Sequence, residues 1–261
     1  MWLFLNLNRI LNSVQQKTNM KLIKLNAIDS TNAFLKGLAS KQELENFTVV
    51  SAESQTKGKG QMGAVWTAEA SKNLIMSVLV KYFLLDASQI FNLNIAVSVA
   101  VIEVLESINI PDLSIKWPND IMSYNKKIGG ILIENSIKSD GTIISIVGLG
   151  LNVNQIDFEN LPKASSLAVI CNKEFDKDEL LFSIIDKMEL NIKLWKQQFD
   201  FLWSDYINKL FKKGIPMPFS DLNNNHFMGI IQGVSAIGKL QVLLEDDNIA
   251  EFDIKEIQML Y

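Results

Sequence analysis

The chain has 261 residues, of which 48% are hydrophobic, and a formal net charge of −4. The length suits one main domain with a small second one, and the negative charge argues against nucleic-acid binding as the main activity, because neutralising phosphates requires a basic surface. A single cysteine and a single histidine exclude a disulfide framework, a Cys-based metal site and a His-rich metal site, and they argue against a Ser-His-Asp triad. We therefore expect no metal bound by protein side chains and a reducing compartment, the cytoplasm.

Residues 1–20 precede the regular patterns of the sequence. Their apolar run is interrupted by Asn6, Asn8 and Arg9, and it has neither a basic start nor a small-residue cleavage site, so it does not resemble a secretory signal. No segment reaches the length of about 20 apolar residues that a membrane span requires. We expect residues 1–20 to be an N-terminal extension, with Met20 as the true start, and no contact with a membrane.

The first part of the main domain alternates strands and helices. The cluster Asp29-Ser30-Thr31 predicts the N-cap of a helix through Leu38. An almost wholly apolar run predicts a buried helix from Asp86 or Ser88 to about Ser107. Alternating or β-prone runs predict strands over 21–26, 47–52 and 73–80.

Residues 114–153 have the pattern of an antiparallel meander, with turns at 123–126 and at Asp140-Gly141. Apolar residues at helical spacing then predict one helix, or two with a break, over 177–210.

The composition changes at residues 213–218. Beyond them, β-prone segments are separated by Gly229, Gly233, Gly238 and a turn at 245–248. This pattern predicts a small all-β barrel over 213–261, packed on a main domain over 21–212. The expected fold class is α+β, with a mixed or antiparallel sheet and flanking helices.

The loop that runs from Gln55 to Trp66 (QTKGKGQMGAVW) is rich in glycine and lysine. Glycines let the backbone run against a ligand with its N–H groups pointing inward, and the lysines add charge where phosphate oxygens can sit. The same composition equally fits a solvated basic loop. It is not a P-loop, because GxxxxGK[ST] is absent.

Two further segments combine polar side chains with strand patterns. In Lys116-Trp117-Pro118-Asn119-Asp120, an amide and a carboxylate follow an extended Trp-Pro step, which in isolation also fits a simple turn. In the segment 126–134 (KKIGGILIE), a lysine enters an apolar strand thinned by glycines. Lys126 fits a side chain that reaches solvent, whereas Lys127 can point either to solvent or into a pocket.

Taken together, these segments resemble the biotin protein ligase family over nearly the whole chain from Lys21. The order and spacing of the motifs carry the resemblance, which also includes Asp29-Ser30-Thr31-Asn32 and the segment 148–153 (GLGLNV). The resemblance implies a fold related to class II aminoacyl-tRNA synthetases and lipoate ligases, followed by an SH3-like barrel. It also implies ATP and Mg²⁺ as cofactors, biotin as substrate and a biotin carboxyl carrier domain as partner.

The resemblance assigns a role to each matching position. Ser30, Thr31 and Gln55 would hydrogen-bond the ureido ring of biotin, and Asp120 would help the acceptor lysine lose its proton. Lys127 would hold the biotin carboxylate, with Lys59 as a further catalytic cation. The implied biotin site contains Ser30, Thr31, Asn32, Gln55, Gly58, Lys59, Gly60, Gln61, Lys127 and Gly130, with Gly129 leaving room for the ligand. The implied ATP site contains Lys59, Trp66, Lys116, Asn119, Lys127 and Asn152.

The chain also departs from the family pattern. The family loop is usually arginine-rich (GRGRxGR), whereas here Lys59 replaces an arginine, and Gln61 and Ala64 remove two charges. We therefore expect the adenylate to be held less tightly than in an arginine-loop relative. No winged-helix segment precedes the main domain, so we expect a monofunctional ligase without a DNA partner, as a monomer or homodimer.

Three alternatives compete with this interpretation. A lipoate or octanoate ligase of the same fold would use the same acyl-adenylate chemistry, although Ser30-Thr31, Gln55 and the C-terminal barrel favour biotin. A catalytically weakened biotin- or nucleotide-binding module would explain the altered loop, but the presence of Asn119, Asp120 and Lys127 argues against it. An interaction protein built on the barrel has no specific support.

Overall fold

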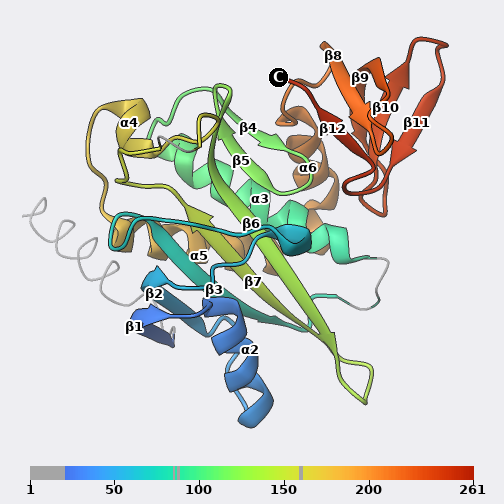
Figure 1. Ribbon diagram of the computed structural model, residues 1–261. Coiled ribbons are helices and arrows are strands. Elements are labelled where there is room, and N and C mark those ends of the chain that lie inside the picture. Colours follow the sequence, from blue (N-terminus) through green and yellow to red (C-terminus); the bar gives the residue numbers. More distant parts are fainter. Residues whose placement is uncertain (1–20, 85, 87–88, 159–160) are drawn as a thin grey trace, which may run out of the picture.

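The structure, a computed structural model, describes residues 21–84, 86, 89–158 and 161–261. Its main sheet has seven strands in the order β1-β2-β3-β7-β6-β5-β4 (Figure 1). The expected extension over 1–20 and the alternative helix start at Ser88 lie outside the described residues. The strands of this sheet are β1 (Leu22–Ile28), β2 (Val49–Gln55), β3 (Leu74–Lys81), β4 (Leu113–Lys116), β5 (Asp120–Ser123), β6 (Lys126–Ile137) and β7 (Ile143–Leu151).

The main sheet is mixed. β1 pairs with β2 in parallel, and the remaining neighbours, from β2–β3 to β4–β5, pair antiparallel. The three early strands confirm the sequence prediction with shifts of up to three residues at their ends. β4 to β7 confirm the meander, including both of its turns. The predicted α+β fold with a mixed sheet is therefore confirmed.

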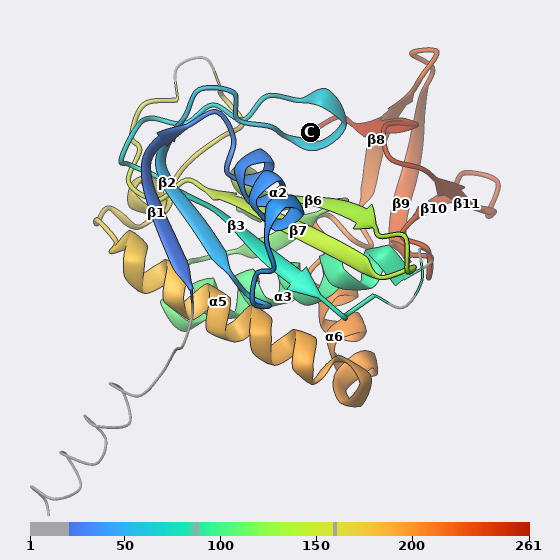
Figure 2. The ribbon, with the colours of Figure 1, turned by 90° about the horizontal axis from the view of Figure 1, so that it is seen from below.

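Helices cover both faces of this sheet (Figure 2). α2 (Thr31–Lys41) lies on one face, and α3 (Ile90–Ser107), α5 (Lys177–Lys193) and α6 (Trp195–Asn208) lie on the other. The periodic segment over 177–210 thus forms two helices, which join at Leu194. Two short elements, η1 (Gln61–Gly63) and α4 (Leu167–Cys171), complete the main domain.

α3 is the central helix of the core. Within the described part of the chain it is the one helix long and apolar enough to cross a membrane. Every residue from Leu93 to Ile102 is buried, however, and α5 and α6 pack against the helix. Its apolar composition is explained by this burial, as the sequence predicts.

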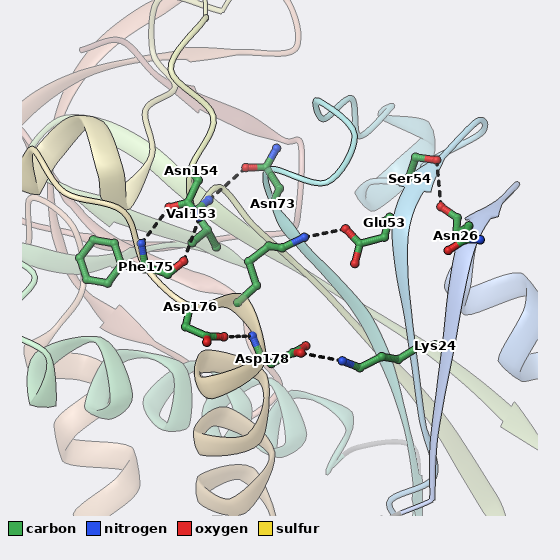
Figure 3. A network of polar contacts seen from close by, with 11 residues as sticks. Lys24, Asn26, Glu53, Ser54, Asn73, Val153, Asn154, Phe175, Asp176 and Asp178 are labelled. Atoms are coloured by element: carbon green, nitrogen blue, oxygen red, sulfur yellow. Dashed lines mark hydrogen bonds and ion pairs between the residues drawn. The ribbon is translucent and has the colours of Figure 1, made fainter.

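α5 is tied to the two parallel strands by a polar network (Figure 3). Asp176 caps the helix by accepting a hydrogen bond from the backbone N–H of Asp178. The Asp178 carboxylate pairs with Lys24 of β1 at 2.6 Å, and Lys177 pairs with Glu53 of β2 at 2.7 Å. These contacts fix β1 and β2 against the helix layer.

The C-terminal sheet contains β8 (Pro216–Asp221), β9 (His226–Val234), β10 (Leu240–Leu244), β11 (Ile249–Phe252) and β12 (Ile257–Met259). Its order is β11-β10-β9-β8-β12, with antiparallel neighbours.

The prediction that Gly229 and Gly233 separate strands is wrong, because both lie inside β9. Gly229 serves packing instead, since a Cβ there would lie 2.4 Å from Cγ1 of Val242. His226 begins β9, the second strand of this sheet in chain order.

The C-terminal sheet packs on the main domain through a continuous core. Buried Phe219, Ile231 and Leu240 belong to the same hydrophobic cluster as α3. The indole N–H of Trp117 also donates to the Gly238 carbonyl at 2.8 Å. The domain boundary at residue 213 and the barrel geometry stay predictions, because this shared core crosses the boundary.

Candidate functional site

A cavity of about 620 Å³ lies between the main sheet, the glycine loop (residues 56–66) and the C-terminal sheet. This volume is within the range of small-molecule sites. The predicted site residues that line it are Ser30, Thr31, Asn32, Gln55, Lys59, Gly60, Gln61, Trp66, Lys116, Asn119, Asp120, Lys127 and Gly130.

One end of the cavity is built from the turn between β1 and α2 and from the end of β2. Because β1 and β2 are parallel, their carboxyl ends lie side by side, with Ile28 opposite Gln55. Ser30 is the N-cap of α2 and accepts from the N–H of Ala33. The side-chain oxygen of Gln55 (Oε1) lies 2.7 Å from the backbone N–H of Thr31, from which it accepts, and 3.0 Å from the Thr31 hydroxyl. We call this end, lined by Ser30, Thr31 and Gln55, the head pocket.

The glycine loop is a tight hairpin that covers the cavity. Gly60 donates to the Ala64 carbonyl, and Trp66 donates to the Gly58 carbonyl. A Cβ at Gly58 would lie 2.3 Å from the Trp66 carbonyl oxygen, so glycine is required there. At the tip, Met62 is exposed, and its carbonyl accepts from Lys255 of the C-terminal sheet at 2.6 Å. The loop is thus held between the two sheets.

Trp66 forms part of the cavity wall. A Cβ at Gly150 would lie 2.5 Å from its ring. The indole can therefore pack on the backbone of β7 only because residue 150 is glycine. The indole N–H is buried, and within the described residues it has no hydrogen-bond partner. A buried donor without a partner in a cavity wall is suited to a ligand acceptor.

The other end of the cavity centres on an ion pair. Lys127 Nζ lies 2.5 Å from Asp120 Oδ1, and both side chains are partly exposed. The register between β5 and β6 shifts beside Met122, so that the strands meet as Ile121–Gly129 and Met122–Lys127. This bulge re-aims the side chains that follow it. A Cβ at Gly130 would lie 3.4 Å from Lys127 Nζ, so the glycine leaves room around the ion pair.

Lys116 adds a second cation at this end, on β4 beside Asp120. Burial lowers the pKa of Lys116, the charges of Lys127 and Lys163 lower it further, and Asp120 opposes the shift. The Lys116 ammonium therefore loses its proton at a lower pH than an exposed lysine does. Together Lys116 and Lys127 outweigh the charge of Asp120 at this end, and Lys59 adds a further cation to the lining of the cavity.

Three predicted residues do not line the cavity. Gly58 and Gly129 lie behind its wall, where they permit close backbone approach. The prediction that Asn152 contacts ATP is not supported by its position. Its amide donates to the Ser165 carbonyl at 2.9 Å and its backbone N–H to the Ile128 carbonyl at 2.7 Å, and both bonds hold the protein interior together.

The C-terminal domain contributes one wall of the cavity, which the sequence pattern did not predict. Its lining residues are Phe219, Leu222, Ile231, Leu240, Ile254, Lys255, Ile257, Gln258 and Met259. Apart from Lys255 and Gln258 these are apolar residues that fit an ordinary barrel core, so the pattern gave no signal of a ligand-facing role.

The single cysteine and the single histidine lie outside the cavity. Cys171 is half-buried at the end of α4, and His226 is exposed at the start of β9. Across the described ranges, no group of three or more His, Cys, Asp or Glu side chains is arranged to hold a metal ion. Asp120 is the one carboxylate that lines the cavity in this part of the chain.

Comparisons with known proteins agree on one family. Residues 25–152 match the Biotin/lipoate A/B protein ligase family. The chain is 28% identical to the biotin–[acetyl-CoA-carboxylase] ligase of Mycobacterium tuberculosis over 81% of its own length and 79% of the relative. It is 32% identical to the bifunctional ligase/repressor BirA of Bacillus spizizenii, of which it spans 51%.

A solved structure gives the same result. The biotin protein ligase from Aquifex aeolicus, in complex with biotin and ATP, is 29% identical and superposes with a TM-score of 0.74. The match covers 92% of this chain and 98% of that one. The chain thus shares its fold with a biotin protein ligase that was solved in complex with biotin and ATP.

Proposed function

The chain belongs to the biotin/lipoate A/B protein ligase family, and from this premise we propose that it is an ATP-dependent biotin protein ligase. It would form biotinyl-5′-adenylate and then transfer biotin to a lysine of a biotin carboxyl carrier domain. The observation that carries this proposal is a single cavity that joins an amide- and hydroxyl-lined end to a lysine-lined end.

The polarity of the head pocket supports biotin as the acid. The carbonyl of Gln55 is occupied by Thr31, so the Gln55 amide offers its N–H groups to the ligand. A cyclic urea supplies a carbonyl acceptor for these donors, whereas a dithiolane ring or a plain fatty chain does not. Between the two ends, Ile75, Met76 and Leu149 line the cavity and suit the aliphatic tail.

The positive end supports adenylate formation. When the biotin carboxylate attacks the α-phosphate, negative charge accumulates and is stabilised by fixed cations and N–H donors. Lys127 is the proposed cation for the carboxylate, which would compete with Asp120 for its ammonium group. Lys59 and Lys116, which line the cavity, are the proposed partners of the phosphates, and Trp66 is the proposed wall of the nucleotide site.

Mg²⁺ is expected to enter with ATP. Such ions are held by one or two carboxylates together with substrate phosphates. Asp120 meets the first requirement as the cavity carboxylate of the described residues, and the phosphates would supply the other ligands. The ion would neutralise phosphate charge during attack.

ATP–pyrophosphate exchange with biotin, lipoate and octanoate in parallel tests the proposal. Exchange that depends on biotin is the expected result. Exchange only with lipoate or octanoate would assign the chain to the sister activity within the family. No exchange with any acid, but retained biotin binding, would support a binding module that has lost catalysis.

The proposed partners follow from the same chemistry. The acceptor is a carrier domain, in line with the carboxylase named for the Mycobacterium relative. The net charge of −4 supports the absence of a DNA partner, and the single cysteine supports a role in the cytoplasm.

The lowered pKa of Lys116 predicts a pH dependence of ATP binding. As pH rises toward 10.5, the ordinary value, the buried ammonium loses its charge before exposed lysines do. We expect the KM for ATP to rise with pH in this alkaline range, while the KM for biotin changes less. Lys116→Arg keeps its charge throughout and should flatten the profile. An unchanged profile in Lys116→Arg would remove Lys116 from the phosphate site.

The arginine-poor loop predicts weak retention of the adenylate. Gln61 lines the cavity and carries no charge where the family pattern has a positive one. We expect Gln61→Arg to slow adenylate dissociation by about tenfold, the effect of one added charge-assisted hydrogen bond. A chase of preformed adenylate measures this rate, and Ala64→Arg provides a second position. A dissociation rate unchanged in both variants would contradict the expectation.

A further inference from the structure

The head pocket is supported by a buried chain of polar side chains that starts on β6. The Asn32 amide donates to Glu134 Oε2 at 2.9 Å and to the Leu132 carbonyl at 3.4 Å. The hydroxyl of Ser77, which is fully buried on β3, lies 2.6 Å from Asn32 Oδ1 and 2.8 Å from Thr31 Oγ1. The Thr31 hydroxyl in turn lies 3.0 Å from Gln55 Oε1. These hydrogen bonds therefore connect Glu134 to Thr31 and Gln55, two of the residues that line the head pocket.

The chemistry of these groups fixes the direction of the chain. A carboxylate and a carbonyl only accept hydrogen bonds, so the NH₂ group of Asn32 must face Glu134 and Leu132. Its Oδ1 must then face Ser77, and because an amide oxygen only accepts, Ser77 donates its single proton to Asn32. The Thr31 hydroxyl then donates to the Ser77 oxygen at 2.8 Å or to Gln55 Oε1 at 3.0 Å, so in either case its proton is used inside the protein.

The pocket therefore presents a fixed pattern of donors and acceptors. The Thr31 hydroxyl already donates its one proton within the protein, so toward the ligand it can act only as an acceptor. The side-chain oxygen of Gln55 is occupied by the backbone N–H of Thr31, so Gln55 presents its side-chain N–H groups. Such a pattern fits a ligand head with an N–H group beside a C=O group.

Packing prevents the chain from relaxing into another arrangement. Asn32 is buried at the start of α2, and a Cβ on Gly148 of β7 would lie 2.4 Å from its Oδ1. The absence of a side chain at Gly148 thus gives the amide its place between β7 and β3. A buried polar network whose members are all hydrogen-bonded is costly to break.

We propose that Ser77 and Glu134 are positioning residues that set the ligand specificity of the head pocket. They act through Asn32 and Thr31. Their effect is that the pocket binds a carboxylic acid with a cyclic urea in preference to a carboxylic acid that lacks this group. This inference rests on the proposed function. Neither side chain lines the cavity, so their effect is on the orientation of groups that do.

The test combines equilibrium dialysis of biotin with exchange kinetics in Ser77→Ala, Glu134→Leu and Glu134→Gln. We expect Ser77→Ala and Glu134→Leu to weaken biotin binding by about tenfold, with the KM for ATP and the kcat of exchange within about twofold. Glu134→Gln retains an acceptor for Asn32 and should restore most of the affinity. Ser145→Ala, a buried serine on β7 that bonds Asn135, is the matched control and should bind biotin like the wild type.

The outcomes separate this inference from the proposed function. Unchanged biotin affinity in Ser77→Ala and Glu134→Leu would overturn it. A parallel rise in the biotin dissociation constant and the ATP KM would also overturn it, because that pattern indicates a general structural defect. If Ser77→Ala does not fold, the contrast between Glu134→Leu and Glu134→Gln decides. Wild-type protein that binds biotin without exchange would reject the ligase activity and leave the dialysis test intact.

Discussion

Lys127→Ala is expected to lower biotin-dependent ATP–pyrophosphate exchange by about 10²–10³-fold, the usual effect of removing one group that stabilises developing charge. Lys127 Nζ sits at the positive end of the cavity, paired with Asp120 at 2.5 Å and 5.9 Å from the centre of the Trp66 ring. Without it, Lys116 and Lys59 still line the cavity, but both are assigned to the phosphates and not to the biotin carboxylate. The loss should appear mainly in kcat.

Lys126→Ala is the matched control for this variant. Lys126 is the preceding residue, but its side chain is exposed and donates to the Pro162 carbonyl. Its removal should leave exchange within about twofold, as for most surface substitutions. Equal losses in the two variants would contradict the assignment of Lys127, as would full exchange in Lys127→Ala. Thermal unfolding of both variants checks that neither loss reflects an unfolded protein.

Asp120→Asn is expected to separate the two half-reactions. Exchange should fall by about tenfold at most, because Lys127 keeps its charge and the ATP phosphates supply most of the ligands of Mg²⁺. Transfer from preformed adenylate to the carrier should fall by about 10²–10⁴-fold, the range for loss of a general base. Asp120 is the cavity carboxylate next to Lys127 and is therefore the candidate acceptor of the proton from the incoming lysine.

The pH dependence of transfer gives a second reading of the same variant. An acceptor lysine with an ordinary pKa of about 10.4 deprotonates by itself as pH rises, so it then no longer needs a base. The transfer rate of Asp120→Asn should therefore approach that of the wild type at alkaline pH. A deficit that is constant across pH would indicate that Asp120 only holds Lys127 in place.

Local patterns made much of the fold predictable. The N-cap at Ser30 depends only on residues close in sequence. The Ser30 hydroxyl accepts from the N–H of Ala33, as the predicted helix start requires. The meander over β4–β7 follows from alternation and from the turn at Asp140-Gly141. In the C-terminal sheet, Gly229 was mistaken for a boundary because its role depends on Val242, on another strand.

Only the residues within recognisable motifs could be assigned to the candidate site from the sequence. The motif segments bring Ser30, Gln55, Lys116 and Lys127 to one cavity, as expected from the family resemblance. Asn152 does not line the cavity, because its amide and backbone N–H bond Ser165 and Ile128, and its contact with ATP stays a prediction.

Contacts between distant segments gave no signal in the sequence. Lys255 reaches the glycine loop from 193 positions away, and Asn32 reaches Glu134 across 102 positions. No periodicity or spacing within the sequence encodes such pairs, so the supporting chain behind the head pocket emerged only in three dimensions.

The central claim is that this cavity makes biotinyl-adenylate and passes the biotin on. The most direct test is a single turnover with biotin and ATP labelled at the α-phosphate, followed by addition of a biotin carboxyl carrier domain. The predicted result is an enzyme-bound labelled biotinyl-adenylate that disappears as labelled AMP is released and the intact mass of the carrier rises by one biotinyl group. Absence of the adenylate, or carrier labelling that does not consume it, would contradict the account.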